Sequence, residues 1–205
     1  MKGKYIVIEG GEGAGKDTQI ENLRREFGEE NFVFTREPGG TRIGKVLRNM
    51  LLHESEGPVS LPAEFFLFLG DRAQHVEELI KPMLNVGKNV VSNRSYISFL
   101  AYQVYGRQQR DWEDLVRLAI DKIFEDTPID LAIILDVPYE VGHARMVKVG
   151  KELDVIERAA GGLHERVREA FLDIAKTMPA AKVIDASRPA EDVWKDVKEA
   201  VQSVL

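Results

Sequence analysis

Residues 5–23 decide the fold, and they read Tyr5-Ile6-Val7-Ile8-Glu9-Gly10-Gly11-Glu12-Gly13-Ala14-Gly15-Lys16-Asp17-Thr18-Gln19-Ile20-Glu21-Asn22-Leu23. A short apolar run ends in a glycine-rich turn, and a helical pattern opens directly after it. Glycines lack a Cβ atom, so successive backbone N–H groups of such a turn can point inward around an anion. The following helix adds the positive end of its dipole. The stretch therefore predicts a phosphate-binding turn between a strand and a helix.

The spacing of this turn matches the phosphate-binding loop G-x-x-x-x-G-K-[ST], except at the last position. Asp17 stands where the motif has Ser or Thr, and a hydroxyl comes one residue later at Thr18. Lys16 can reach the β- and γ-phosphates as a mobile charge. The alternative is a glycine-rich turn with a surface lysine, but the flanking strand and helix are those that the motif requires. The predicted ATP-binding residues are Gly10, Gly11, Glu12, Gly13, Ala14, Gly15, Lys16, Asp17 and Thr18.

Length and composition point to one domain spanning residues 1–205. The chain is 44% hydrophobic, which is enough for one sizeable core, and no linker or repeat divides it. The net charge of −6 argues against nonspecific binding of nucleic-acid polymers. Without cysteine there are no disulfides, and no apolar run approaches the roughly 18 residues of a membrane span. We therefore expect a cytoplasmic protein with no membrane partner.

Five short apolar runs rich in Val and Ile are separated by helical patterns. Their apolarity is continuous rather than alternating, as in strands that are buried on both faces. Strands that alternate with helices form parallel sheets, which bind ligands at the carboxyl ends of the strands. The sequence therefore predicts an α/β fold with a five-stranded parallel sheet flanked by helices. The predicted strands are Tyr5–Ile8, Phe32–Thr35, Asn89–Ser92, Leu131–Asp136 and Lys182–Asp185.

A tight turn with the sequence TREPGGT, residues 35–41, follows the second predicted strand. Arg36 lies at the end of this strand, where a guanidinium that faces the phosphate-binding loop would suit a second phosphoryl group. A surface salt bridge of Arg36 is equally compatible with the sequence. Thr41 is expected to cap the N-terminus of a helix over residues 42–52.

The helical segment Pro62–Asn85 carries several aromatic residues, and Pro82 is expected to bend or interrupt it. We expect Phe65 and Phe66 to pack in the core. Phe68 and Arg72 are four residues apart, so they share one helical face and could offer a flat ring and a planar donor to a base. Core packing of Phe68 is the alternative.

A polar cluster directly follows the third predicted strand, with Arg94 two residues after its last residue. Arg94 is predicted to lie between two phosphate groups. Ser98 and Tyr102 share a helical face, and Gln103 lies beside it. Alternatively, Tyr102 is a half-buried core ring, and Ser95 is only a helix cap.

The end of the chain offers fewer functional signals. Residues 163–176 and 190–204 show the apolar periodicity of amphipathic helices that cover a sheet. The histidines are scattered and are expected to be surface or capping residues, with no transition-metal site. They are His53, His75, His143 and His164.

Four motifs occur together in one order: EGGEGAGK (residues 9–16), REPGGT (36–41), DRAQ (71–74), and Arg94 with Ser98 and AYQ (101–103). In this arrangement the chain resembles the thymidylate kinases over essentially its whole length. The resemblance implies the P-loop NTPase fold, a short lid, and transfer of the γ-phosphoryl group of ATP to dTMP, which gives dTDP and ADP for dTTP biosynthesis. It also implies Mg²⁺ as cofactor and a homodimer.

The resemblance assigns roles on the dTMP side by position. It implies that Phe68 stacks on thymine and that Arg72 donates to an exocyclic oxygen of the base. Glu12 would lie near the sugar 3′-hydroxyl, and Tyr102 would disfavour a ribose 2′-hydroxyl. The implied substrate-binding residues are Glu12, Arg36, Phe68, Arg72, Arg94, Ser98, Tyr102 and Gln103.

The resemblance also implies roles near ATP. The segment 185–188, with Arg188, would pass near adenine, and residues 147–158 would form the lid. Arg145 is the first choice for the cation that reaches the transferred phosphate, ahead of Lys148, Lys151 and Arg158. The implied catalytic residues are Lys16, Arg94, Arg145 and Glu12, and the implied metal ligands are Asp17 and Glu157.

Three positions depart from the family pattern. Asp17 replaces the usual hydroxyl residue, Asn93 stands in place of an aspartate, and Val155 stands where a lid arginine is often found. A carboxylate at position 17 could bind Mg²⁺, although it would repel phosphates in the absence of the ion. Two other functions stay open on the sequence alone: a kinase for another or several nucleoside monophosphates, and a nucleotide-binding module with little turnover.

Overall fold

The apolar runs form strands whose side chains alternate between two cores. In the computed structural model, which describes residues 2–52, 57, 59–150 and 162–205, strand β1 (Tyr5–Gly10) is buried along its whole length. Tyr5 and Val7 belong to one apolar cluster, whereas Ile6 and Ile8 belong to the other. This burial on both faces explains why the apolarity of the run is continuous.

Within the described residues, five parallel strands form one sheet in the order β2-β3-β1-β4-β5. Strand β1 is therefore central, and Ile8 is in register with Asn93 of β3 and with Ile133 of β4. The predicted fold is confirmed, and each predicted strand is present with nearly the predicted bounds. The other strands are β2 (Phe32–Arg36), β3 (Asn89–Asn93), β4 (Leu131–Asp136) and β5 (Ala181–Asp185).

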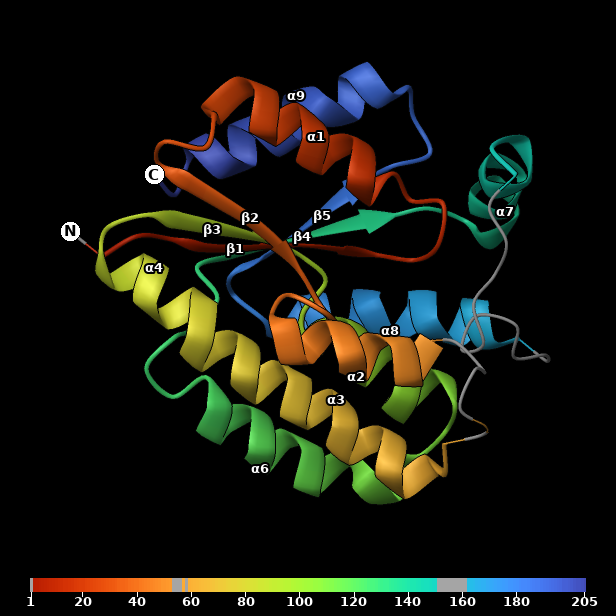
Figure 1. Ribbon diagram of the computed structural model, residues 1–205. Helices are drawn as coiled ribbons and strands as arrows, with labels where there is room; N and C mark the ends of the chain where they lie inside the picture. Colours follow the sequence, from red (N-terminus) through yellow and green to blue (C-terminus); the bar gives the residue numbers. More distant parts are fainter. Residues whose placement is uncertain (1, 53–56, 58, 151–161) are drawn as a thin grey trace.

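Helices cover both faces of the sheet (Figure 1). Helices α1 (Lys16–Phe27) and α9 (Ala190–Gln202) cover one face, and α7 (Tyr139–Lys148) lies beyond the carboxyl end of β4. The elements on the other side are α2 (Arg42–Leu52), α3 (Leu61–His75), η2 (Val76–Ile80), α4 (Lys81–Asn85), α5 (Tyr96–Phe99), η3 (Leu100–Gly106), η4 (Arg110–Trp112), α6 (Glu113–Ile123) and α8 (Leu163–Thr177). None of the described helices is both long and apolar enough to cross a membrane.

Pro82 changes one turn of its helix without ending it. Helix α3 runs into the wide π-helical turn η2, and α4 continues directly from it. The backbone N–H of Lys81 donates to the carbonyl of Val76, five residues back, which is the π-helical pattern. The segment 61–85 thus stays helical despite the missing N–H group of proline.

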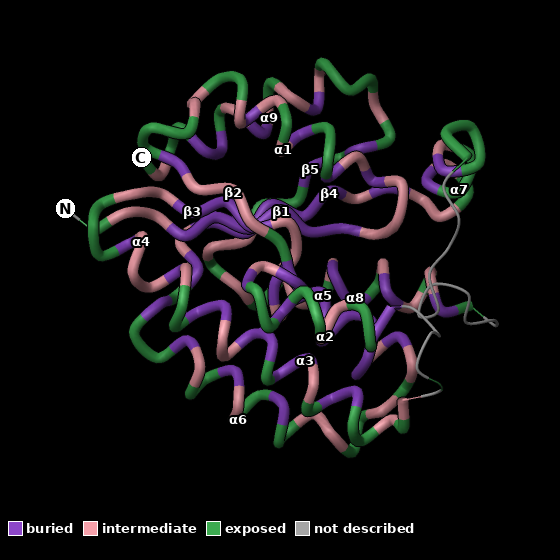
Figure 2. The backbone as a smooth tube through the Cα atoms, in the orientation of Figure 1, coloured by how far each residue is buried: buried purple, intermediate pink, exposed green. Residues whose placement is uncertain are grey.

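Two predictions about burial were wrong. Phe65 is fully buried, but the adjacent ring of Phe66 is 57% exposed and contacts Trp112 edge-on. His75 is fully buried rather than on the surface. Figure 2 shows that the buried residues concentrate in the sheet and on the helix faces turned toward it. Neighbouring helical positions point about 100° apart, and on α3 the core covers the side of Phe65 but not that of Phe66.

Candidate active site

A cavity of about 550 Å³ opens at the carboxyl ends of the strands, next to the phosphate-binding loop. Most predicted site residues line this cavity, although they come from distant parts of the sequence. They are Glu12, Gly13, Gly15, Lys16, Asp17, Thr18, Arg36, Phe68, Arg72, Arg94, Ser98, Tyr102, Gln103 and Arg145. Gly10, Gly11, Ala14 and Arg188 are not among the residues that line it.

The loop between β1 and α1 needs glycine at two positions for different reasons. Gly15 has φ +91° directly before α1, a conformation that L side chains rarely adopt. A Cβ atom at Gly13 would lie 2.1 Å from the carbonyl oxygen of Gly142 in α7. The Nζ atom of Lys16 donates to the carbonyl oxygens of Gly10 (3.0 Å) and Gly11 (2.7 Å). The ammonium group of Lys16 therefore lies over the predicted phosphate-binding loop.

Arg94 connects this loop with the helices on the opposite wall. Its guanidinium donates to the carbonyl oxygen of Gly10 (3.2 Å), to the Ser98 hydroxyl (2.8 Å) and to the Glu12 carboxylate. The same group lies 5.1 Å from the centre of the Tyr102 ring. The backbone of Arg94 has φ +72°, which is uncommon for a residue other than glycine and typical of functional sites. Arg94 therefore lies between the P-loop and the segment of Ser98, and its predicted position between two phosphate groups stays a prediction.

Glu9, to which the sequence patterns gave no role, holds Ser95 and Ser98 by hydrogen bonds. Its fully buried carboxylate accepts hydrogen bonds from the hydroxyls of Ser95 (2.7 Å) and Ser98 and from the backbone N–H of Ser98 (3.3 Å). Burial raises the pKa of Glu9, while the hydrogen bonds from Ser98 and the charge of Arg94 oppose this rise. Ser98 thus joins a buried carboxylate to Arg94. Ser95 accepts from the backbone N–H of Ile97 (3.2 Å), so it caps α5 in addition to its bond with Glu9.

Arg94 stays protonated although its side chain is half-buried. Burial alone would lower the pKa of its guanidinium, but the Tyr102 phenol and the carboxylates of Glu12 and Glu9 raise it well above its ordinary value. A fixed positive charge therefore lies where the P-loop meets the rest of the cavity.

Phe68 and Arg72 lie together on the wall formed by α3. The Phe68 ring is buried, and its centre lies 5.4 Å from that of Phe99. The guanidinium of Arg72 lies 5.2 Å from the centre of the same Phe99 ring, and its Nε atom donates to Glu37 at 2.8 Å. Both residues line the cavity, with the predicted ring and donor on one helical face.

Glu37 and His75 form a buried network behind Arg72. The Nδ1 atom of His75 lies 3.0 Å from the Glu37 carboxylate, and its Nε2 atom lies 2.7 Å from the hydroxyl of Thr35. Burial alone would raise the pKa of Glu37, but Arg72 and His75 together hold it below its ordinary value. These bonds explain the burial of His75, which local sequence patterns did not indicate.

Two further arginines lie near the turn after β2. Arg36 is exposed and lines the same cavity as the P-loop residues, and its contact with a phosphoryl group stays a prediction. Arg48, on α2, also lines this cavity and donates to the carbonyl oxygen of Pro38 at 2.9 Å. The local sequence around Arg48 gave no sign of this position, because an arginine on an amphipathic helix usually indicates only a solvent-exposed charge. Thr41 caps α2 as predicted, since its hydroxyl accepts from the N–H of Gly44 at 2.9 Å.

Asp17 and Asn93 face each other at the edge of the cavity. The Nδ2 atom of Asn93 donates to Oδ1 of Asp17 at 2.7 Å. A carboxylate next to an amide oxygen is a donor set that suits Mg²⁺, which prefers oxygen ligands. The described residues contain no group of three or more acidic, His or Cys side chains placed to hold a metal. Glu157, the other predicted ligand, lies outside the described residues.

On the side predicted for ATP, Arg145 joins two loops. Its guanidinium donates to the carbonyl oxygens of Ala186 (2.8 Å), Ser187 (3.2 Å) and Gly13 (3.4 Å). Arg188 instead donates to the Asp185 carbonyl (3.0 Å) and pairs with Asp196 of α9. Lys148 is exposed and does not line the cavity, and the lid positions Lys151, Val155 and Arg158 lie outside the described residues.

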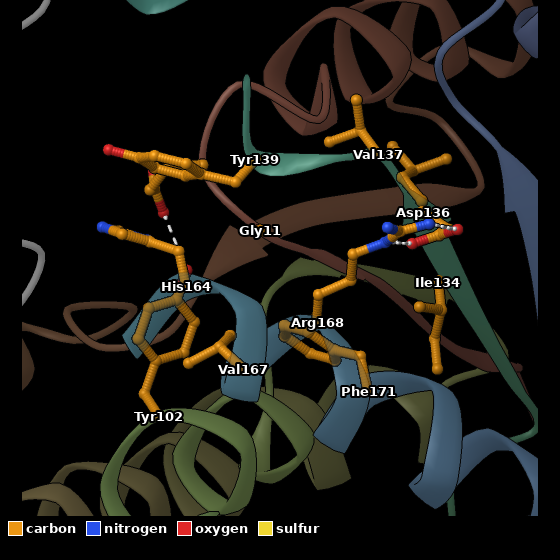
Figure 3. Close-up of a pocket in the computed structure, with 12 residues that line it drawn as sticks. Gly11, Tyr102, Ile134, Asp136, Val137, Tyr139, His164, Val167, Arg168 and Phe171 are labelled. Atoms are coloured by element: carbon orange, nitrogen blue, oxygen red, sulfur yellow. Dashed lines mark hydrogen bonds and ion pairs between the residues drawn. The ribbon is translucent and has the colours of Figure 1, made fainter. Parts of the chain in front are cut away.

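A second, much smaller cavity of about 20 Å³ lies behind Glu12 and Tyr102. Figure 3 shows Arg168 reaching toward Asp136 at the end of β4, with N–O distances of 2.6 and 2.8 Å. The rings of Tyr139 and His164 are stacked nearby, with their centres 4.5 Å apart. This space holds about one water molecule, so it is too small for a nucleotide.

Comparison with known proteins decides the family. The model of the family described as thymidylate kinase matches residues 8–197. The chain belongs to the thymidylate kinase family. The thymidylate kinase of Carboxydothermus hydrogenoformans is 44% identical over 97% of this chain and 96% of its own. That of Pelotomaculum thermopropionicum is 42% identical over 100% of this chain and 95% of its own.

A solved structure agrees with the family. The crystal structure of thymidylate kinase from Ehrlichia chaffeensis covers 98% of this chain and 99% of its own, with a TM-score of 0.75 and 31% identity. This likeness confirms the predicted P-loop NTPase fold. Membership of the thymidylate kinase family confirms the predicted activity, which is ATP-dependent phosphorylation of dTMP.

Proposed function

We propose that Arg94 brings the two substrates together for the transfer of the γ-phosphoryl group of ATP to dTMP, which gives ADP and dTDP. The placement of Arg94 carries this proposal, because its guanidinium contacts the P-loop at Gly10 and the opposite wall at Ser98. Phosphoryl transfer requires little covalent chemistry from the protein and depends on holding two anions in line. A permanently charged guanidinium at the junction would offset their repulsion and the charge on the moving group.

On the donor side, the P-loop would hold the ATP phosphates. Backbone N–H groups of residues 10–18 and the start of α1 favour negative charge, and Lys16 adds a mobile cation. Arg145 would position the loop at residues 186–187 against the P-loop, because it is bonded to carbonyl oxygens of both. We also propose that Arg145 contacts the transferred phosphate.

On the acceptor side, the α3 wall would hold the base of dTMP. Phe68 offers a ring for stacking, and Arg72 offers planar N–H donors beside it. Tyr102 and Gln103 would border the sugar, and Glu12 would lie near its 3′-hydroxyl. The phosphate of dTMP would lie among Arg94, Arg36 and Arg48.

The divalent cation of the reaction would be held at Asp17. Mg²⁺ prefers oxygen ligands and usually takes only one or two protein carboxylates together with substrate phosphates. When bound, the ion would neutralise phosphate charge and polarise the transferred group. Asp17 lines the cavity beside Lys16, which supports this assignment.

We also propose that the protein is a cytoplasmic homodimer. Ile43, Val46 and Met50 recur at helical spacing along α2, and all three are exposed. Leu118 of α6 is a further exposed apolar side chain on this side of the sheet. Burying such a stripe against a second copy removes apolar surface from water. Sedimentation should give a dimer, and Val46→Glu should shift it toward monomer, whereas a monomeric wild type would contradict the proposal.

A coupled assay of ADP release tests the function. Turnover with ATP is measured for dTMP, dUMP, UMP, CMP, AMP and GMP, and we expect the highest kcat/KM with dTMP. Arg94→Ala should lower kcat about 10³-fold, by comparison with arginine residues that stabilise phosphoryl transfer in other enzymes. Arg25→Ala, which removes an arginine from the exposed side of α1, serves as control. A better acceptor than dTMP, or turnover that survives Arg94→Ala, would contradict the proposal.

A further inference from the structure

The carboxylate of Asp17 has a different kind of hydrogen-bond partner from the other carboxylates that line the large cavity. Glu12 and Glu37 are each bonded to an arginine. Within the described residues, Asp17 is bonded instead to the neutral amide of Asn93, at 2.7 Å. Its negative charge is therefore not balanced by a guanidinium, as the other two are.

The fold brings this pair together from two elements. Asp17 is the second residue of α1, and Asn93 is the last residue of β3, in register with Ile8 of the central strand. Both line the cavity next to Lys16. Because the two side chains touch, a carboxylate at either position would place its charge at nearly the same point.

The hydrogen bond also restricts how Asp17 can turn. Asn93 donates to Oδ1, which limits the rotation of an otherwise exposed carboxylate and leaves Oδ2 available to a cation. A ligand that is held by a second residue binds metal better than one that is free to rotate. Asn93 is therefore a positioning residue for Asp17.

We propose that Asp17 and Asn93 act as one carboxylate–amide unit that binds the divalent cation, and that the two residues can exchange places. This inference rests on the proposed ATP-binding function. One carboxylate makes nucleotide binding depend on the cation, because its charge repels phosphate when the cation is absent and attracts the cation when it is present. Two carboxylates would strengthen this dependence, and two amides would weaken it.

The test measures ADP binding by calorimetry, once with EDTA and once with Mg²⁺, and compares the two Kd values. The ratio of Kd in EDTA to Kd in Mg²⁺ should fall at least about tenfold in Asp17→Asn. It should rise in Asn93→Asp and return to within about threefold of wild type in the double variant Asp17→Asn/Asn93→Asp. Glu21→Gln, which removes a carboxylate from the same helix outside the cavity, should leave the ratio unchanged.

The outcomes separate this inference from the function on which it rests. A ratio in Asp17→Asn equal to that of Glu21→Gln would overturn the inference and make Asp17 only a favourable charge at the start of a helix. If the double variant has the same Kd ratio as Asp17→Asn, the proposal that the two residues can exchange places is wrong. If the wild type binds no ADP under either condition, the proposed ATP site itself fails. Thermal unfolding followed by circular dichroism verifies that each variant is folded.

Discussion

Glu37 and Arg72 form an ion pair at 2.8 Å in which only 1% and 3% of the two side chains are exposed. The carboxylate comes from the turn after β2, and the guanidinium comes from α3, so the pair connects two walls of the cavity. Because Glu37 holds the Nε atom, the position of the guanidinium is fixed in advance for its proposed contact with the base.

Glu37→Gln should weaken dTMP binding and destabilise the protein. Neutralising Glu37 leaves the buried charge of Arg72 without its carboxylate, which costs about 3 kcal/mol of unfolding free energy. We expect KM for dTMP to rise about tenfold, equivalent to about 1.4 kcal/mol, with a smaller change in kcat. Denaturant unfolding and steady-state kinetics measure the two effects.

Glu64→Gln is the matched control for this variant. Glu64 also lies on α3 and pairs with Arg107 at 2.8 Å, but neither residue lines the cavity. This substitution should leave KM for dTMP unchanged. If Glu37→Gln lowers stability without raising KM, Glu37 supports the fold and does not position Arg72 for the base.

The stability conferred by Glu37 should depend on pH. Arg72 and His75 lower the pKa of its carboxyl below the ordinary value of 4.5 against the opposing effect of burial. The unfolded state therefore takes up this proton first as the pH falls, so the contribution is complete above pH 4.5 and is lost below it. The difference in unfolding free energy between wild type and Glu37→Gln should shrink as the pH drops from 6 toward 3, roughly the range of carboxyl titration. A difference that stays constant would argue against the ion pair as its source.

Ser98→Ala should slow catalysis by loosening Arg94. The Ser98 hydroxyl accepts from Arg94 at 2.8 Å and donates to the buried carboxylate of Glu9. Its removal leaves Glu9 with one donor fewer, which costs about 1–3 kcal/mol of stability. We expect kcat to fall about tenfold, a loss of about 1.4 kcal/mol in transition-state stabilisation. Ser203→Ala, at the end of α9, should change neither quantity appreciably, and an unaltered kcat in Ser98→Ala would show that Arg94 holds its place without this hydroxyl.

Gly142→Ala should weaken ADP binding by pushing α7 away from the P-loop. The added Cβ atom would lie 2.3 Å from the carbonyl oxygen of Glu12, so one backbone must move. We expect a loss of about 1–3 kcal/mol in stability, typical of overpacking, together with a higher Kd for ADP because Arg145 moves with α7. Gly70→Ala adds the same group where no atom lies within 4 Å, and it should leave the ADP affinity unchanged. Equal affinities in both variants would indicate that the P-loop tolerates the displacement.

Local sequence patterns predicted the strands and the ends of several helices because these depend on near neighbours. Thr41 caps α2, and the helix spans Arg42–Leu52 as expected. Continuous apolar runs mark strands with two covered faces, which held for β1 and β4. The motifs also identified residues, such as Phe68 and Arg94, that are distant in the sequence but line one cavity.

The remaining features depend on contacts between segments that are distant in the sequence. Phe65 and Phe66 are both apolar and adjacent, so periodicity alone did not tell which ring faces the core. His75 is buried because its two ring nitrogens meet Thr35 and Glu37, about 40 residues earlier in the chain. Nothing in the local sequence around His75 indicates those partners.

The central place of β1 in the sheet has a consequence for the order in which the protein assembles during translation. The residues that pair with Ile8 in β3 and β4, Asn93 and Ile133, are synthesised about 85 and 125 residues later, so the hydrogen bonds of β1 are complete only after both strands have been made. Until then the apolar side chains of β1 are open to other contacts, which favours aggregation of the incomplete chain. The strand that leads into the phosphate-binding loop is thus the first to be synthesised, but its pairing is complete only after β4 has been made.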